Sequence, residues 1–126
     1  MLVAVAIIGL VLIFARKEYL ESIYFSNALG CETTVHSELP SPGSDFKAIV
    51  FEKECGATTN FNTQVSLLPL YEKFDSEQYP PVLIVDGRIR LPIVWLDAYH
   101  LKISVPSGAT VYRKDRQYKG IQIDYE

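Results

Sequence analysis

The sequence predicts a mainly β protein: a small antiparallel meander or sandwich preceded by an N-terminal helix. Three observations predict this fold class. From residue 32 onward, short apolar or alternating runs are separated by turn signals that contain Pro and Gly. The chain has 8 Tyr and 6 Phe, and aromatic residues favour half-buried sheet surfaces. Finally, 126 residues that are 48% hydrophobic and 21% charged are typical of one globular domain with a modest core.

The N-terminal segment differs from the rest of the chain. The run MLVAVAIIGLVLIFA carries no charge from Met1 to Ala15. As a helix it would be about 22 Å long, against about 30 Å for a hydrocarbon core, and would span if Arg16 and Lys17 extended to the interface. We expect residues 1–30 to be a transmembrane anchor continued by an amphipathic stalk helix. The alternatives are a cleaved signal peptide, a lipoprotein signal that ends at Cys31, and a buried core helix.

Residues 31–126 are expected to form one extracytoplasmic antiparallel β domain. TTVHSEL at 33–39 is the candidate first strand, and PSPGSD at 40–45 is a turn. FKAIVFEKE at 46–54 is almost continuously apolar in its centre, which is typical of a strand covered on both faces. TQVSLLPLY at 63–71 is the next strand.

The second half of the expected domain contains the clearest turn signal and the clearest alternation. PPVLIVDGRIRLPIVWL at 80–96 predicts a hairpin, because Asp86-Gly87 is a strong two-residue turn signal between apolar runs. Apolar and polar residues then alternate, as in half-buried strands. Three more strands are predicted: HLKISV at 100–105, ATVYRK at 109–114 and KGIQIDYE at 119–126.

Two stretches carry a resemblance to a known family. SPGSDFKAIVFEKECGATTNFNTQVSLL and the later VWLDAYHLKISV resemble an uncharacterised family of small, membrane-anchored bacterial envelope proteins, a domain of unknown function with a Cys-Gly-Ala-Thr-Thr signature. The resemblance extends from Cys31 to about Val105. It implies an earlier cysteine soon after the membrane segment, which Cys31 matches, and it implies no activity.

The two cysteines, Cys31 and Cys55, admit several roles. A nucleophilic Cys55 would need a base within reach, and the chain has only two histidines, His36 and His100. Two Cys and two His match one zinc site in composition, but no pair has the short spacing of zinc ligands. Two unrelated buried thiols are another alternative. We expect a Cys31–Cys55 disulfide, because two cysteines and no others suit an oxidising compartment.

The residues after Cys55 form the candidate binding corner. Gly56 would allow a sharp turn with positive φ, and polar side chains beyond it can bond the loop's own backbone. A structural corner stapled by the disulfide is the simpler interpretation, and binding of an anion or a peptide end is the functional one. The candidate residues are Gly56, Thr58, Thr59, Asn60 and Thr63.

Two features of the sequence predict opposite orientations in the membrane. Arg16 and Lys17 follow the apolar run, and the positive-inside rule would place that side in the cytoplasm. A disulfide between strands is useful only where thiols oxidise. We therefore expect a single-pass protein of the cell membrane with its C-terminal domain outside the cytoplasm, periplasmic or at the cell surface.

No enzymatic activity is predicted. The net charge of −3, without a basic stripe, gives no reason to expect nucleic acid. The chain has no P-loop, dinucleotide, serine-elbow or zinc-protease motif, so we expect no cofactor and no metal. The expected partners are the membrane and a protein. The main hypothesis is a non-catalytic binding or structural module of the envelope. The alternatives are an inhibitor or immunity-type protein against an envelope-acting toxin or hydrolase and, with least support, an enzyme that uses Cys55.

Overall fold

A computed structural model describes residues 31–43, 45–56 and 61–126 of the chain. The chain divides into two units, residues 1–32 and residues 33–126. The anchor and stalk helix expected at residues 1–30 lie outside the described residues. Within the described ranges, no helix has the length and apolar character needed to cross a membrane.

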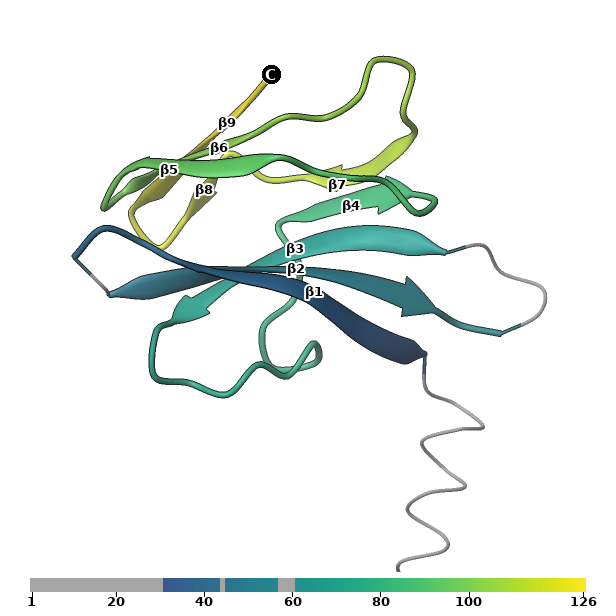
Figure 1. The fold of residues 1–126 in the computed structure, drawn as a ribbon, viewed down its shortest axis with the longest axis horizontal. Coiled ribbons are helices and arrows are strands. Elements are labelled where there is room, and N and C mark those ends of the chain that lie inside the picture. Colours follow the sequence, from purple (N-terminus) through teal and green to yellow (C-terminus); the bar gives the residue numbers. More distant parts are fainter. Residues whose placement is uncertain (1–30, 44, 57–60) are drawn as a thin grey trace, which may run out of the picture. The chain divides into compact units, whose positions relative to one another are not determined.

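The described part of the chain is mainly β, as predicted, and its nine strands form two sheets (Figure 1). The first sheet has the strand order β1-β2-β3-β4-β7 and the second β5-β6-β9-β8. The bounds are β1 Glu32–Pro40, β2 Phe46–Glu54, β3 Asn62–Pro69, β4 Leu83–Asp86, β5 Ile93–Asp97, β6 His100–Ile103, β7 Val111–Lys114, β8 Gln117–Tyr118 and β9 Ile121–Tyr125.

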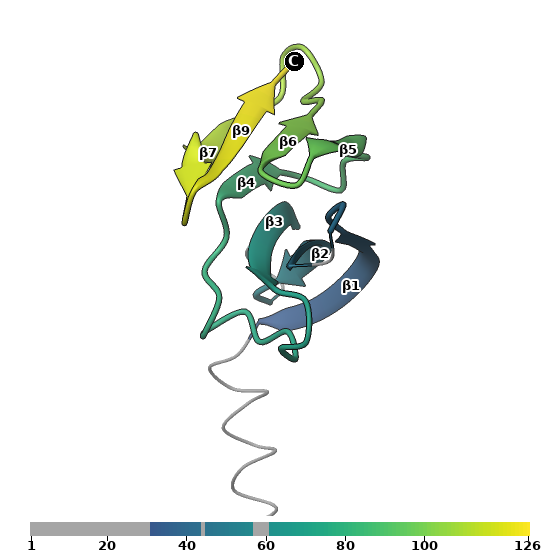
Figure 2. The ribbon, with the colours of Figure 1, turned by 90° about the vertical axis from the view of Figure 1, so that its left-hand side faces the viewer.

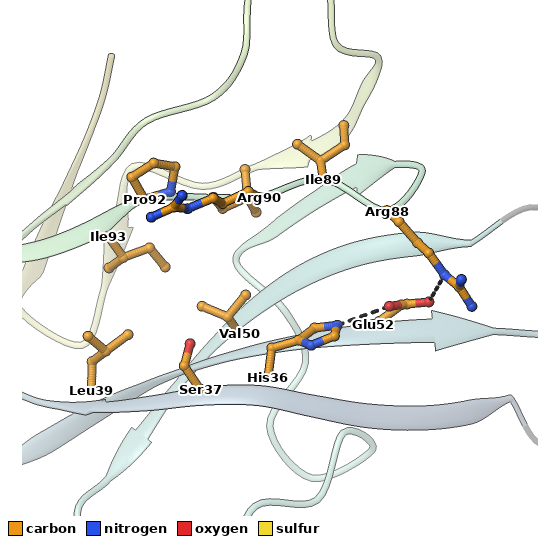
Figure 3. A pocket seen from close by; sticks show the side chains of 11 residues that line it. His36, Ser37, Leu39, Val50, Glu52, Arg88, Ile89, Arg90, Pro92 and Ile93 are labelled. Carbon is orange, nitrogen blue, oxygen red and sulfur yellow. Dashed lines mark hydrogen bonds and ion pairs between the residues drawn. The ribbon is translucent and has the colours of Figure 1, made fainter.

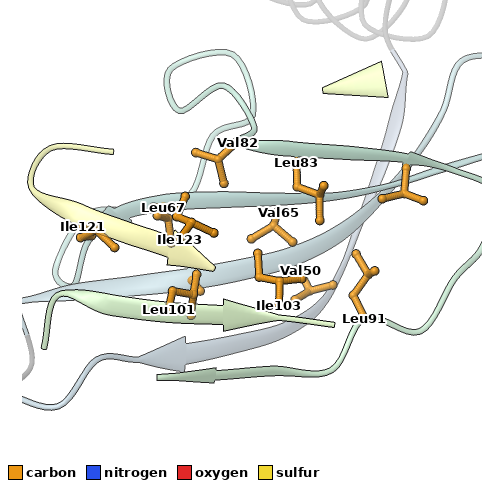
Figure 4. Packing of buried hydrophobic residues seen from close by; sticks show 12 residues of the cluster. Val50, Val65, Leu67, Val82, Leu83, Leu91, Leu101, Ile103, Ile121 and Ile123 are labelled. Atoms are coloured by element: carbon orange, nitrogen blue, oxygen red, sulfur yellow. The ribbon is translucent and has the colours of Figure 1, made fainter. Parts of the chain in front are cut away.

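The core lies between the two sheets (Figure 4). Period-two alternation puts one apolar face of β6 and one of β9 inside, so that Leu101 and Ile103 of β6 meet Ile121 and Ile123 of β9 in the same cluster. Strands β2, β3 and β4 of the first sheet supply the opposing side chains. The twelve buried members are Ala48, Val50, Val65, Leu67, Val82, Leu83, Val85, Leu91, Leu101, Ile103, Ile121 and Ile123.

Strands β2 and β3 are buried on both faces, which confirms the expectation from the continuous apolar run. Their second face carries Ile49, Phe51 and Leu68, which pack with Tyr79 and Phe74 of the connection between β3 and β4. The rings of Phe51 and Phe74 lie 4.8 Å apart between centroids. This connection therefore covers the side of the first sheet that faces away from the second sheet.

The hairpin predicted at Asp86-Gly87 is wrong. Strand β4 pairs with β3 and β7, whereas β5 belongs to the other sheet. Gly87 does have a positive φ of 88°, so the turn signal describes the local backbone correctly. The chain then crosses between the sheets through residues 87–92 and does not fold back on β4.

The fold is also not wholly antiparallel. Strands β6 and β9 pair in parallel, with His100 opposite Gln122 and Ile103 opposite Tyr125. After β6 the chain adds β7 to the first sheet and returns through β8, so that β9 enters beside β6 in the same direction. The architecture is a mixed two-sheet sandwich, and a simple meander does not describe it.

The predicted disulfide is present: Cys31 and Cys55 are bonded to each other, and no cysteine of the chain is free. Cys31 directly precedes β1 and Cys55 directly follows β2. The bridge therefore joins the start of the edge strand to the end of its neighbour.

Strands β1 and β5, the edges of their respective sheets, lie on the same side of the sandwich (Figure 2). Trp95 of β5 links them, because its Nε1–H donates to the main-chain oxygen of Leu39 in β1 at 2.9 Å. Trp95 and Leu39 also pack against the core. This side of the molecule contains the site described next.

Candidate functional site: a cleft beside the edge strand

A cleft of about 660 Å³ opens between β1, β2 and the segment that crosses from one sheet to the other (Figure 3). One wall is formed by β1 and β2, which contribute His36, Ser37, Leu39, Val50 and Glu52. The opposite wall is the crossing segment and the first residue of β5, residues 88–93. The cleft thus combines an apolar interior with polar and charged groups at its rim.

Glu52 is the centre of the charged rim. His36 Nε2 donates to Glu52 Oε2 at 2.9 Å, and Arg88 Nε donates to Glu52 Oε1 at 2.5 Å. The Glu52 side chain is only 12% exposed, whereas those of His36 and Arg88 are 50% and 63% exposed. Burial by itself raises the pKa of the Glu52 carboxyl, but the hydrogen bonds and charges of His36 and Arg88 outweigh burial and hold this pKa below its usual value.

Arg88 has a second partner, the aromatic ring of Phe61. Its guanidinium carbon lies 3.6 Å from the ring centroid of Phe61, a cation–π contact. The ion pair with Glu52 and this stacking hold Arg88 along the rim from two directions. Its charge is therefore largely matched within the fold.

Arg90 has no such match. The ion pairs between described residues include Arg88 and Arg113 but none that involves Arg90. Arg90 is exposed on the cleft wall, beside Ile89 and Pro92 (Figure 3). The cleft therefore carries one unmatched guanidinium next to an apolar surface.

Thr63 holds the crossing segment in place. Its side chain is buried, with 2% of the residue exposed, and its hydroxyl donates to the main-chain oxygen of Gly87 at 2.7 Å. The same hydroxyl accepts from the main-chain N–H of Ile89 at 2.9 Å. Two backbone bonds, Asp86 N to Thr110 O and Gly87 N to Phe61 O, fix the start of the segment. The wall that carries Arg88 and Arg90 is thus built on β3.

Among the residues of the candidate binding corner, Thr63 is directed inward and its hydroxyl is used by the fold, so it offers nothing to a ligand. Gly56 is exposed and has φ of 116°, in agreement with the sharp turn expected there. Thr58, Thr59 and Asn60 lie outside the described residues. Of the two corner residues that the structure describes, neither Gly56 nor Thr63 lines the cleft.

Sequence reasoning missed the cleft. The two partners of Glu52 are 16 residues before it and 36 residues after it in the sequence. No local spacing marks such a cluster, because its members come from β1, β2 and the crossing segment. The apolar centre of β2 followed by Glu52 was the one available hint.

The cleft offers groups that suit binding. A histidine held by a carboxylate can act as a general base, but the pair needs a nucleophile at hydrogen-bond distance. In the described ranges, no hydroxyl or thiol hydrogen-bonds to His36, and Arg88 competes for Glu52. The geometry offers a fixed guanidinium, a free guanidinium and an apolar floor.

The second histidine forms a separate surface pair. His100 Nδ1 lies 2.7 Å from Asp97 Oδ2, and this hydrogen bond raises the pKa of His100 despite partial burial. The backbone N–H of Tyr99 and the imidazole of His100 in turn lower the pKa of Asp97. Across the described residues, no cluster of three or more His, Cys, Asp or Glu could hold a metal ion.

Comparison with known proteins adds no relative: no family model, no curated protein and no solved structure matches the chain.

Proposed function

We propose that the chain is a membrane-tethered, non-catalytic binding module of the cell envelope, and that it docks a protein partner on the free edge of β1. The observation that carries the proposal is the state of this edge strand. β1 is nine residues long, and residues 32–38 are all exposed. It has a neighbour, β2, on one side only.

Exposed edges of this length are usually protected against pairing with other chains. The common protections are charged side chains, above all lysines, internal prolines, bulges or a covering loop. β1 contains no Lys, its one Pro is its last residue, Pro40, and its two charged residues, Glu32 and Glu38, lie towards its ends. Val35 in its middle is 47% exposed. An edge whose middle has neither Lys nor Pro can accept an extended segment as an added strand, with main-chain hydrogen bonds as the source of affinity.

The disulfide supports both the docking edge and the location. It holds the start of β1 to the end of β2, so less conformational entropy is lost when a partner pairs with the edge. Such bonds persist in oxidising compartments, which supports a domain outside the cytoplasm. The uncharged run at residues 1–15 supports a membrane tether.

Site-specific photo-crosslinking in the producing cells tests the docking edge. A benzophenone side chain at Val35 should give a discrete protein adduct. The same group at Tyr71 or Tyr112 should give none, although these residues are 94% and 61% exposed. Tyr112 lies on β7, the opposite edge of the first sheet, so an equal adduct there would contradict the choice of edge. If the adduct contains a hydrolase or toxin, the binding module acts as its inhibitor.

A pair of proline variants tests whether pairing is through the main chain. In an antiparallel edge strand, successive N–H groups point alternately to the neighbour and to solvent. Of Thr33→Pro and Thr34→Pro, one therefore removes a bond to β2 and the other a free donor. The variant that keeps the wild-type melting temperature should lose the Val35 adduct. An unchanged adduct in that variant would exclude strand addition.

Protease treatment of intact cells or spheroplasts tests the location. A C-terminal tag should be removed while a cytoplasmic control protein stays intact. A protected tag, with Cys31 and Cys55 open to alkylation in membranes, would place a reduced domain in the cytoplasm.

A further inference from the structure

The cleft next to β1 has a surplus of positive charge. Its rim holds two guanidiniums, those of Arg88 and Arg90, and one carboxylate, that of Glu52. Both oxygens of Glu52 are already occupied by His36 and Arg88. The remaining guanidinium, that of Arg90, is free to receive an anion. Arginine suits a carboxylate because its planar donors match the two oxygens.

The interior of the same cleft is apolar. Leu39, Val50, Leu91 and Ile93 line it, and all four also belong to the core cluster or pack against it. A volume of about 660 Å³ exceeds what a single aliphatic side chain needs. The half-exposed His36 and Arg88 show that the cleft opens to solvent along β1. An occupant can therefore enter from the strand edge while most of its length stays outside.

We propose that this cleft receives the carboxy-terminal residue of an extended peptide that pairs with β1. The aliphatic side chain of that residue would lie on Leu39, Val50 and Ile93, and its terminal carboxylate would bind Arg90. This proposal rests on strand addition at β1, the proposed function, and specifies the partner segment that the edge selects.

A chain end fits better than an internal acidic residue. In an internal strand segment, an acidic and an aliphatic side chain share a face only when they are two residues apart, about 7 Å along the strand. At a carboxy terminus, the carboxylate and the side chain belong to one residue. The single unmatched guanidinium beside an apolar floor matches this combination of groups within one residue.

Arg88 acts as a positioning residue here. Glu52 and Phe61 hold it at the rim, so its guanidinium shapes the wall beside Arg90 while Glu52 matches its charge. Loss of the Glu52 partner would leave Arg88 as a competing receptor for the anion. Binding of the carboxylate at Arg90 alone therefore depends on the ion pair between Arg88 and Glu52 as well as on Arg90 itself.

The test measures binding of a defined peptide pair to the purified full chain in one constant non-ionic detergent. The probe is amino-terminally fluorescein-labelled Ser-Thr-Val-Thr-Leu, prepared with a free carboxyl terminus and as the carboxy-terminal amide. Fluorescence anisotropy gives both affinities. Because a charge-assisted hydrogen bond is lost, we expect the amide to bind at least about tenfold more weakly. Equal affinities of acid and amide would overturn the proposal.

Two matched variants locate the carboxylate. Arg90→Gln should remove the preference for the acid and leave the affinity of the amide unchanged. Arg116→Gln removes the same charge from an exposed arginine between β7 and β8 and should keep the preference. A preference that survives in Arg90→Gln, or that Arg116→Gln also abolishes, would overturn the assignment.

Two outcomes separate this inference from the proposed function. If neither peptide form binds up to about 1 mM while the Val35 adduct forms in cells, the chain-end preference is wrong and edge docking remains. The other outcome is that dodecanoate displaces the acid peptide, while the proline variant that keeps its melting temperature binds dodecanoate and the acid peptide as tightly as the wild type does. In that case the cleft is an acyl site, and strand addition is wrong as well.

Discussion

The Thr63 hydroxyl should control the stability of the segment that joins the two sheets. Thr63→Val keeps the shape of the side chain and removes its only polar atom. The main-chain oxygen of Gly87 then loses its donor, and the N–H of Ile89 loses its acceptor. Because Thr63 is 2% exposed, no water replaces the hydroxyl at its own position.

The expected loss of stability follows from these two main-chain groups, which no longer have a hydrogen-bond partner. A buried polar group left without a partner costs about 1–3 kcal/mol. Gly87 and Ile89 are half-buried, so water can reach them in part and the lower half of that range applies to each. We expect Thr63→Val to lower the free energy of unfolding by about 2–4 kcal/mol. Thr63→Ser keeps both bonds and loses one methyl group, at about 1 kcal/mol.

Urea denaturation of the full chain in constant detergent measures these differences. Trp95 is the sole tryptophan, and its bond to Leu39 makes its fluorescence a reporter of the contact between β1 and β5. Thr110→Val is the matched control. Thr110 is exposed and accepts a hydrogen bond from the N–H of Asp86 through its main-chain oxygen, so this substitution should change the free energy of unfolding little. A Thr63→Val loss no larger than that of Thr63→Ser would refute the role of the hydroxyl.

Three further perturbations have defined outcomes. Replacing Cys31 and Cys55 by Ser opens a loop of about 25 residues and should cost about 3.5 kcal/mol in urea denaturation, with reductant then having no further effect. Trp95→Phe keeps an aromatic ring but leaves the main-chain oxygen of Leu39 in β1 without its donor. Thermal unfolding followed by circular dichroism should therefore show a loss of about 1–2 kcal/mol in the free energy of unfolding. The hydrogen bond that His100 donates to Asp97 raises the pKa of His100, so this pair stabilises the fold fully below pH of about 6.5, and the stabilisation disappears as the pH rises through the raised pKa. NMR titration should show the pKa of His100 falling in Asp97→Asn, and an unchanged pKa would contradict this cause.

Several elements could be predicted from sequence because their signals are local. The apolar centre of residues 46–54 reports a strand buried on both faces, and the structure places one cluster on each face of β2. The alternation at Ile121 and Ile123 reports a strand with one buried face. The pairing of Cys31 with Cys55 had no competitor within the chain once an oxidising compartment was assumed.

The tertiary structure alone decided which strands became neighbours. Gly87 needs a positive φ whether the chain turns into a hairpin or crosses to another sheet, so the Asp86-Gly87 signal could not distinguish these paths. Parallel pairing of β6 with β9 depends on the excursion through β7, a feature that no window of the sequence contains. The cleft has the same origin. Side chains from β1, β2 and the crossing segment meet around Glu52 only after the sheets have packed, because burial and hydrogen bonding between distant segments act after the local backbone preferences are satisfied.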